Sequence, residues 1–439
     1  MGEFLSYLCW QRPLTMNYAT LPNLIALFIL VAVFWAISRR ATAERLHLWL
    51  VGWILILLHF VAQFVTAGEG AWSRVATTIN LDCLALAGVA FLVSCSLIAL
   101  DQRRQLLLGI AIAAPALSYV NGVIWGIADP DFYYFLIAIG AAAPLMVFWR
   151  YSRRGHSYGV IVTAAVVLMA AVTAWIVARG AGALGITVIL ASLNLVAAIL
   201  YWNRYRRPTA GVLTAVLGFA AWGAVFPTSI LISIFLKSVK VDSEVWNIPK
   251  YLVALGMILT LLEDQMEKSQ YLAYHDELTG LPNRRLLEDR MEQALASARR
   301  ARTRVAVLLL DLDHFKEVND NFGHRLGDEA LKGVVTRLAN RIRASDTLAR
   351  SGGDEFTVIS SVNDLSGAEV LAQDLELALS TPIEVGDARV QIGLSVGIAL
   401  YPEDGDTADE LHAAADRAMY AAKRSRSRAV ASLAPEAPA

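Results

Sequence analysis

Four acidic residues in the last third of the chain are spaced so that they could bind a metal ion beside a phosphate. Asp311 and Asp313 end the apolar run 304–310, which has the composition of a buried strand. Asp354 and Glu355 directly follow a Gly-Gly pair, a typical turn of a tight hairpin. If this hairpin lies beside that strand, the carboxylates converge at one edge of a sheet. Carboxylate oxygens are ligands that suit Mg²⁺, which often shares substrate phosphates.

The glycines of that turn, Gly352 and Gly353, are a second feature, because a backbone without side chains lets a phosphate or a nucleobase approach closely. For an arbitrary Asp-Glu pair, a solvated acidic turn is the commoner interpretation. The surrounding sequence determines whether a ligand site or a solvated acidic turn is the better interpretation.

The elements around these residues alternate between strand and helix patterns, which predicts an α/β domain after about residue 263. The expected order is a strand over 304–311, polar helical sequence to about 343, two short strands flanking the glycines, a helix near 366–380, a strand pair near 382–400 and a final helix near 407–425.

The string Gly-Gly-Asp-Glu-Phe at 352–356 resembles the signature of the GGDEF family, the diguanylate cyclases. The resemblance extends over about 275–425, because further segments match the family in the same order: 276–285, 311–328, 395–399 and 415–423. It implies a palm-like α/β domain of the ferredoxin or adenylate-cyclase type, with a central, mostly antiparallel sheet.

The resemblance also implies roles for single residues. The metal would be held by Asp311, the backbone carbonyl of Leu312, Asp354 and Glu355. The catalytic residues would be Asp354 and Glu355, with Asp354 as the candidate base near the attacking 3′-hydroxyl. The guanine edge would be read by Asn319 and Asp328. The triphosphate or ribose would be bordered by His314, Phe315, Lys316, His324, Gly352, Gly353 and Lys423.

The reaction implied by the resemblance is the condensation of two GTP molecules into cyclic di-GMP and two pyrophosphates, with Mg²⁺ or Mn²⁺ as cofactor. Such transfers depend mainly on positioning and on charge stabilisation by the metal. Because one domain would bind one GTP, the active form would be a homodimer with antiparallel sites. The expected partners are GTP and cyclic di-GMP, and no nucleic-acid polymer.

Arg343 and Asp346 precede the glycine pair at the spacing of the family's product-inhibition site, R-x-x-D. An arginine fork suits the N7 and O6 acceptors of guanine, and a carboxylate suits its N–H groups. A surface ion pair at a helix end is the alternative interpretation.

The first 262 residues contrast with this domain. Of the whole chain, 56% is hydrophobic and only 18% is charged, whereas about a quarter is the usual charged share. Nine apolar stretches come close to the roughly 20 residues that a helix needs to cross a bilayer: about 20–38, 46–67, 75–100, 105–128, 131–149, 157–178, 182–203, 210–236 and 248–262. The pattern predicts a polytopic helical domain in contact with membrane lipids.

Arginines gather in alternate loops between these stretches, and short cytoplasmic loops are those that collect Lys and Arg. The odd-numbered loops carry Arg39, Arg40 and Arg45, then Arg103 and Arg104, then Arg150, Arg153 and Arg154, then Arg204, Arg206 and Arg207. We therefore expect a multi-pass protein of the bacterial inner membrane, with its N-terminus outside and its C-terminal domain in the cytoplasm.

The expected domains are a membrane sensor or anchor over 1–262, a helical linker over 263–275, the GGDEF-like domain over 276–428 and a disordered tail over 429–439. The linker contains no Gly or Pro, so it can continue the last membrane helix and transmit a movement. A plain spacer is the alternative. One departure from the family follows Lys423, where Arg-Ser-Arg-Ser-Arg replaces the usual Gly-Arg-Asn stretch and puts phosphate contacts there in doubt.

His59 and Asp82 are ionisable residues inside apolar stretches, where such residues are functional candidates. Counted back from the outer loop that they share, both lie roughly 10 Å below the outer surface. We expect them to be neighbours that line a site for an unknown sensory ligand, or to form a structural pair.

Two other functions stay open at this stage. A catalytically silent receptor of GTP or cyclic di-GMP would have the same fold, although the intact acidic and guanine-reading residues argue against it. A transporter fused to a regulatory domain is the second, and the scarcity of charged residues inside the apolar stretches argues against that.

Overall fold

The structure is a computed structural model that describes residues 18–39, 44–65, 71–95, 102–152, 157–235, 245–386 and 388–433. The chain divides into two compact units, Met1–Asp264 and Gln265–Ala439, each with its own core. The two units are described separately below.

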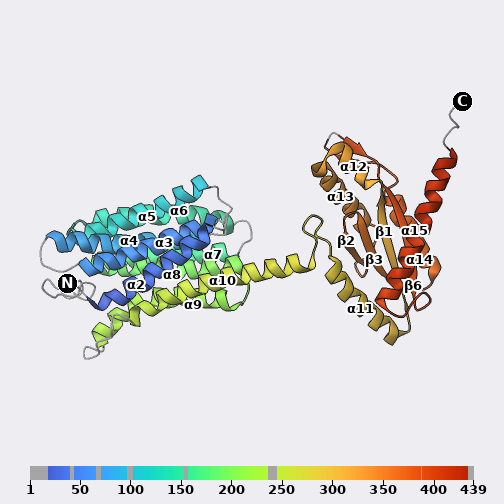
Figure 1. The fold of residues 1–439 in the computed structure, drawn as a ribbon. Helices are drawn as coiled ribbons and strands as arrows, with labels where there is room; N and C mark the ends of the chain where they lie inside the picture. Colours follow the sequence, from blue (N-terminus) through green and yellow to red (C-terminus); the bar gives the residue numbers. More distant parts are fainter. Residues whose placement is uncertain are drawn as a thin grey trace. The chain divides into compact units, whose positions relative to one another are not determined.

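The N-terminal unit is a bundle of long apolar helices (Figure 1). Within the described ranges, nine helices have the length and composition to cross a membrane, as the sequence predicts. They are α2 (Leu21–Ser38), α3 (Glu44–Val65), α4 (Ala71–Cys95), α5 (Gln102–Ile124), α6 (Pro130–Ser152), α7 (Ser157–Ala178), α8 (Gly182–Tyr205), α9 (Ala210–Phe235) and α10 (Ile248–Tyr274), with short 3₁₀ helices η1 (Tyr18–Thr20) and η2 (Val245–Asn247) before α2 and α10.

Helices α9 and α10 approach each other closely, because small residues remove the side chains between them. A Cβ atom on Gly256 of α10 would lie 2.2 Å from the backbone nitrogen of Ala215 in α9. One on Gly218 of α9 would lie 2.7 Å from the backbone nitrogen of Val253 in α10. Small residues of this kind let membrane helices pack backbone to backbone. Helix α10 then continues beyond the apolar stretch as far as Tyr274 without a break.

The C-terminal unit alternates helices and strands. In chain order these are α11 (Arg284–Ala301), β1 (Arg304–Asp313), α12 (Phe315–Phe322), α13 (His324–Ala339), β2 (Thr347–Gly352), β3 (Glu355–Val362), α14 (Leu365–Ala378), β4 (Ile383–Val385), β5 (Ala388–Val390), β6 (Gly393–Tyr401) and α15 (Ala408–Leu433).

Four of these strands form one sheet in the order β2-β3-β1-β6, and each neighbouring pair is antiparallel. This confirms the expected central antiparallel sheet. Alternate side chains of β1 enter two different cores. Leu308 and Leu310 pack in the core that α12, α13 and α14 share, whereas Val307 and Leu309 pack in the core with α11 and α15. The sheet is therefore covered on both faces (Figure 1).

Three details differ from the sequence expectation. Helix α11 was not predicted, although Asn283 caps it by accepting a hydrogen bond from the Leu286 backbone. The segment near 382–400 divides into the separate ribbon β4-β5 and the strand β6, which joins the main sheet beside β1. The tail expected from residue 429 is helical to Leu433, because its residues are good helix formers and Pro435 is the first helix breaker after them. Residues 434–439 of that predicted tail lie outside the described residues.

Candidate active site

The predicted acidic residues meet at one end of the central sheet. Asp311 of β1 lies directly opposite Glu355 of β3 in the antiparallel register, so their side chains share a face. Asp313 is two residues further along β1 and points to that same face, the one covered by α15. The backbone carbonyl of Asp354 accepts a hydrogen bond from the Leu312 nitrogen at 3.2 Å. The acidic residues therefore converge as the sequence predicts. The strand register and the backbone hydrogen bond between Leu312 and Asp354 both bring them together.

Lys423 of α15 reaches this acidic end and donates a hydrogen bond to Asp311 Oδ1 at 2.6 Å. The Asp311 side chain is only 14% exposed, while that of Lys423 is 45% exposed. The hydrogen bond to Asp311 raises the pKa of the Lys423 ammonium, and the charges of Asp311, Asp313 and Asp354 add to this effect. The carboxylates therefore already attract one cation, the ammonium of Lys423.

Gly397 of β6 positions the helix that carries this lysine. A Cβ atom on Gly397 would lie 2.1 Å from the Ala415 carbonyl oxygen and 2.3 Å from the Met419 nitrogen, both in α15. Residues 415, 419 and 423 repeat every four positions and so lie on one face of the helix. Close packing at Gly397 therefore directs Lys423 toward the acidic end of the sheet.

The chemistry of this end fits a hard divalent cation. Its donors are carboxylate and carbonyl oxygens, which Mg²⁺ and Mn²⁺ prefer. Within the described ranges, no group of three His, Cys, Asp or Glu side chains is already gathered as a metal cage. Mg²⁺ commonly uses one or two carboxylates together with water and substrate phosphates, so a ready-made protein cage is not required for it.

The Gly-Gly turn next to these carboxylates is open. Gly353 has φ +55°, and neither Gly352 nor Gly353 has an atom within 4 Å of an added Cβ. Such space lets a ligand approach the backbone, while the left-handed conformation of Gly353 disfavours other residues there.

Arg350 stabilises the conformation of this turn through hydrogen bonds to the turn backbone. Its Nε and Nη2 donate to the Gly353 carbonyl oxygen at 3.0 and 2.7 Å, and its Nη1 donates to Asp276 Oδ1 at 2.8 Å. Burial pushes the pKa of Asp276 up, but hydrogen bonds from Thr279 and Arg350 outweigh it and hold that pKa below its usual value. The segment that follows α10 is thereby connected to the turn through one guanidinium group.

The start of α12 provides a candidate phosphate site. His314 precedes the helix with φ 62°, an uncommon backbone conformation for a residue with a side chain, and its Nδ1 contacts Glu317 Oε1 at 2.8 Å. Backbone N–H groups in the first turn of a helix lack partners inside the helix and favour anions. Phe315 is buried and anchors this turn, whereas Lys316 is exposed. These three predicted residues are therefore adjacent, at the end of β1 next to Asp313.

Asn319 and Asp328 come from two helices that touch at Gly327. A Cβ atom on Gly327 would lie 1.9 Å from Asn319 Oδ1, so the amide of α12 occupies the space beside α13 that a side chain would need. Asp328 is the next residue of α13 and is exposed. His324, the first residue of that helix, is exposed as well. The predicted guanine-reading pair therefore lies on adjoining helices.

The residues expected to bind inhibitory product lie in a turn before β2. The two oxygens of Asp346 accept hydrogen bonds from the Arg343 nitrogen at 2.9 Å and from the Ser360 hydroxyl at 3.0 Å. Arg343 itself is exposed. Asp346 thus holds the turn that presents Arg343.

His59 and Asp82 lie on the neighbouring helices α3 and α4 but make different hydrogen bonds. The Nδ1 atom of His59 lies 3.1 Å from the Asn80 carbonyl oxygen. Asp82 instead accepts from the Asn121 amide of α5, with both of its oxygens at 3.1 Å. Asp82 is therefore paired with an amide, and the expectation that these two residues line one site stays a prediction.

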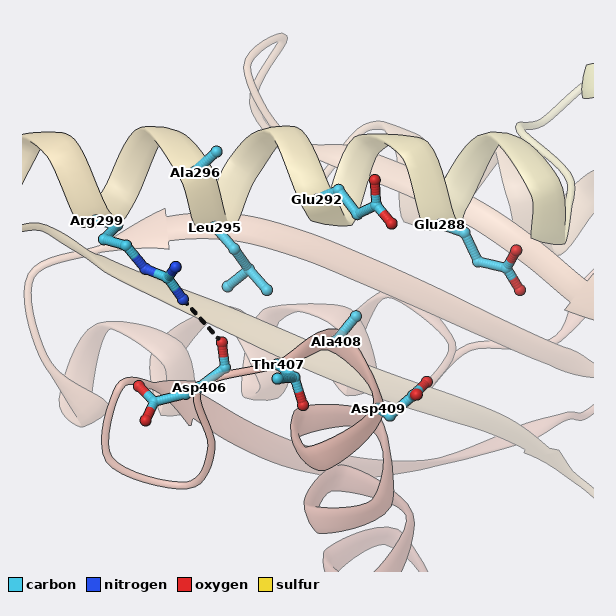
Figure 2. A pocket seen from close by; sticks show the side chains of 9 residues that line it. All are labelled: Glu288, Glu292, Leu295, Ala296, Arg299, Asp406, Thr407, Ala408 and Asp409. Carbon is cyan, nitrogen blue, oxygen red and sulfur yellow. Dashed lines mark hydrogen bonds between the residues drawn. The ribbon is translucent and has the colours of Figure 1, made fainter.

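A groove in the C-terminal unit lies away from these residues, between α11 and the start of α15 (Figure 2). Its polar lining includes Glu288, Glu292 and Asp409, and Arg299 donates to the Asp406 carbonyl oxygen at 3.4 Å. None of the predicted site residues lines it. The candidate site is instead the open end of the sheet described above.

Three positioning residues were missed from the sequence: Gly327, Gly397 and Arg350. Each acts through contacts between segments that are distant in sequence or through a close approach of two elements. A glycine inside a helix or strand pattern is a signal of close packing, and it could have drawn attention to the first two. Nothing local indicates the partner of Arg350.

The part of the chain that carries these residues is similar to known proteins. A family model described as "Diguanylate cyclase, GGDEF domain" matches residues 273–429. The "Bifunctional diguanylate cyclase/cyclic di-GMP phosphodiesterase MucR" of Pseudomonas aeruginosa is 44% identical over 186 residues, which are 39% of this chain and 27% of that protein. The "Diguanylate cyclase TpbB" of the same organism is 43% identical over 166 residues, which are 37% of this chain and 38% of that protein.

A crystal structure of the GGDEF domain of TpbB (YfiN) shares 42% identity, covers 34% of this chain and 92% of that chain, and gives a TM-score of 0.33. The chain spans less than two fifths of the length of the two curated relatives. The residues that the family model matches lie in the C-terminal unit. Residues 273–429 are therefore a GGDEF domain.

Proposed function

We propose that this chain is a membrane-anchored diguanylate cyclase that converts two GTP molecules into cyclic di-GMP and two pyrophosphates. The observation that supports this most directly is the register of Asp311 opposite Glu355, with Asp354 bonded through its backbone to Leu312. Relatives that are named diguanylate cyclases support the same reaction.

The proposed metal ligands are Asp311, the Leu312 carbonyl, Asp354 and Glu355. A bound Mg²⁺ or Mn²⁺ would supply charge stabilisation for the phosphates and the leaving pyrophosphate. The protein's own residues bind and orient GTP. Asp354, at the turn, would accept the proton that the 3′-hydroxyl loses when its oxygen bonds to the α-phosphorus.

The remaining binding roles follow the layout of the site. Asn319 and Asp328 would bind the guanine edge, where an amide and a carboxylate match its acceptors and N–H groups. The first turn of α12, with His314, Phe315 and Lys316, would bind phosphate oxygens through backbone N–H groups and a cation. His324, Gly352, Gly353 and Lys423 would border the ribose and triphosphate.

Because each domain would hold one GTP, the active form would be a homodimer in which two sites face each other antiparallel. The test is stoichiometry. Full-length protein in nanodiscs with GTP and Mg²⁺ should release two pyrophosphates for each cyclic di-GMP, and a chelator should stop both. A silent receptor would bind GTP yet release no pyrophosphate, and that result would refute the enzymatic proposal.

Product inhibition is proposed at Arg343, whose exposed guanidinium could bind a guanine of cyclic di-GMP. The Arg343→Ala variant is the better test, because Asp346→Ala would also remove two hydrogen bonds that hold the turn. Added cyclic di-GMP should slow the parent and leave Arg343→Ala unaffected. Equal inhibition of both proteins would exclude this site.

The proposed location is the bacterial inner membrane, with nine spans, the N-terminus outside and the GGDEF domain in the cytoplasm. The support is the set of nine apolar helices and the alternation of arginine-rich loops. Reporter fusions at the loop positions should give alternating signals that match this topology. A GGDEF domain reached by external protease in intact cells would contradict it.

We further propose that the membrane unit regulates the cyclase through α10. Two acidic residues near the end of its apolar stretch attach it to other helices. Asp264 Oδ2 accepts from Arg45 of α3 at 2.8 Å. Glu263 accepts from Thr209 Oγ1 at 2.5 Å and from the Gly211 nitrogen at 2.9 Å, at the start of α9. A signal that shifts α3 or α9 would thereby act on α10.

The test exchanges the charges of one ion pair. Arg45→Asp and Asp264→Arg should each change cyclic di-GMP output of the full-length protein, while the double variant should return it toward the parent value. An unchanged output in both single variants would show that this attachment does not regulate the enzyme.

A further inference from the structure

A buried lysine lies in the first turn of α10. Lys250 is the third residue of α10 and is only 7% exposed, although it lies in an apolar helix bundle. Intramembrane ionisable residues are expensive to bury and are functional candidates for that reason. The apolar stretches of the sequence indicate His59 and Asp82 as candidates, but not Lys250.

Within the described ranges, the partners of Lys250 are polar or aromatic, and none of them carries a negative charge. Its ammonium donates to the Asn247 amide oxygen at 2.8 Å and lies 4.7 Å from the centre of the Phe60 ring and 5.9 Å from that of Trp222. Among the residues in the described ranges, these are its partners, and no carboxylate forms an ion pair with it. Aromatic faces attract a cation, yet they do not neutralise it.

A titratable side chain beside the Phe60 ring, His59 of α3, does not provide the missing charge. His59 is 4% exposed and packs edge-on against Phe60. Its Nδ1 faces the Asn80 carbonyl, which can only accept, so this nitrogen carries a hydrogen. An imidazole in that state is neutral or positive, never an anion.

The position of Lys250 in the helix adds to the positive field. Lys250 lies in the first turn of α10, near the positive end of the helix dipole, where a lysine is electrostatically unfavourable. Pro249 fixes the start of the helix beside it. Two sources of positive charge therefore coincide in an apolar setting, where an uncompensated charge costs several kcal/mol, as an order of magnitude.

We infer that Lys250 and the start of α10 form a binding site for an anionic group carried on an apolar body, bounded by Phe60 and Trp222. The aromatic rings would contact the body of the ligand, and the ammonium would pair with its carboxylate or phosphate. The source could be a small organic acid or the headgroup of an acidic lipid. A sensory role for this site rests on the proposed regulation through α10, whereas anion binding does not.

Tryptophan fluorescence can test binding without any cyclase activity. All 11 tryptophans of the chain precede residue 263, so thermal unfolding followed by their emission reports on the membrane unit. The full-length protein in phosphatidylcholine nanodiscs is compared with Lys250→Met, which keeps the length of the side chain and removes its charge. Lys268→Met, in the exposed part of the same helix, is the matched control.

Without added anion, Lys250→Met should unfold at the same temperature as the parent or higher, because it removes an uncompensated buried charge. Benzoate should raise the unfolding temperature of the parent and of Lys268→Met by at least about 2 °C. It should not raise that of Lys250→Met, and benzyl alcohol, which has a similar body without charge, should raise none. If phosphatidylglycerol in the nanodisc gives the Lys250-dependent rise in place of benzoate, the anion is a lipid headgroup.

Three results would contradict the proposed anion-binding site at Lys250. A clear drop in the unfolding temperature of Lys250→Met without ligand would show that the lysine has a structural partner. A benzoate effect of equal size in Lys250→Met would show binding elsewhere. No stabilisation of the parent by either benzoate or phosphatidylglycerol would show that no such anion binds. Loss of cyclic di-GMP synthesis with intact anion binding would instead count against the proposed enzyme alone.

Discussion

The contact between Gly327 and Asn319 leads to a prediction in which stability and substrate binding change in opposite directions. A Cβ at position 327 would lie 1.9 Å from Asn319 Oδ1. Since ordinary contacts begin at about 3.4 Å, the amide oxygen must move by roughly 1.5 Å in Gly327→Ala, which is enough to break a hydrogen bond. The helix itself gains, because alanine is favoured over glycine in a helix by up to about 1 kcal/mol.

The expected loss of GTP binding follows from the hydrogen bonds that Asn319 would make to guanine. One or two such bonds contribute about 1 to 3 kcal/mol in total, which corresponds to about a 5- to 150-fold rise in the GTP concentration that gives half-maximal rate. The assay is the rate of pyrophosphate release by full-length protein against GTP concentration, beside a thermal unfolding curve. Gly367→Ala is the control, because an added Cβ at that helical glycine has only ordinary contacts at 3.7 and 3.8 Å.

A double-mutant cycle makes the reasoning refutable. If Gly327 acts only through Asn319, the change Gly327→Ala should cost little further in a protein that already carries Asn319→Ala. Additive losses in the double variant would mean that residue 327 affects GTP by another route. An unchanged GTP dependence in Gly327→Ala would show that Asn319 does not read the base.

Three further predictions concern the support of the site. Gly397→Ala should lower the free energy of unfolding by about 1 to 3 kcal/mol and reduce turnover, because α15 has to move away from β6 and takes Lys423 with it; unchanged melting and activity would refute this. Arg350→Lys should reduce turnover, since an ammonium cannot bind the turn and Asp276 together, and adding Asp276→Asn should cost less than additively. Because the pKa of folded Asp276 lies below its ordinary value of 3.8, its contribution to stability is present above that value and is lost as the pH falls through the folded pKa. Stability of the Asp276→Asn variant should therefore depend less on pH below about 4, and an identical acid dependence in both proteins would contradict the assignment.

The general architecture could be predicted from the sequence because its signals are local. Nine apolar stretches, each long enough for a span, reappear as α2 to α10. The strand before Asp311 and the hairpin around Gly352 and Gly353 also follow from patterns within a few residues. The sequence alone does not show that this strand and this hairpin pair in one sheet. The structure shows the pairing, with Asp311 opposite Glu355.

What could not be predicted depends on contacts between distant segments. The role of Arg350 has no local signal in the sequence, because its hydrogen-bond partner Asp276 lies 74 positions earlier. The similar expected depth of His59 and Asp82 predicts that they are neighbours, but it does not indicate that Asp82 accepts hydrogen bonds from Asn121 of α5. The burial of Lys250 could not be predicted because this residue lies at the edge of an apolar stretch, where lysines usually reach water.

The central claim is that the acidic end of the sheet synthesises cyclic di-GMP, and one measurement tests it most directly. Full-length protein in nanodiscs is incubated with GTP and Mg²⁺ beside Asp354→Ala, Glu355→Ala and the exposed control Glu369→Ala, and cyclic di-GMP is quantified. We predict product from the parent and from Glu369→Ala, and a loss of at least about 100-fold in the two site variants, as for removal of a metal or proton-transfer group. Product at parental levels from Asp354→Ala or Glu355→Ala, or none from the parent, would contradict the claim.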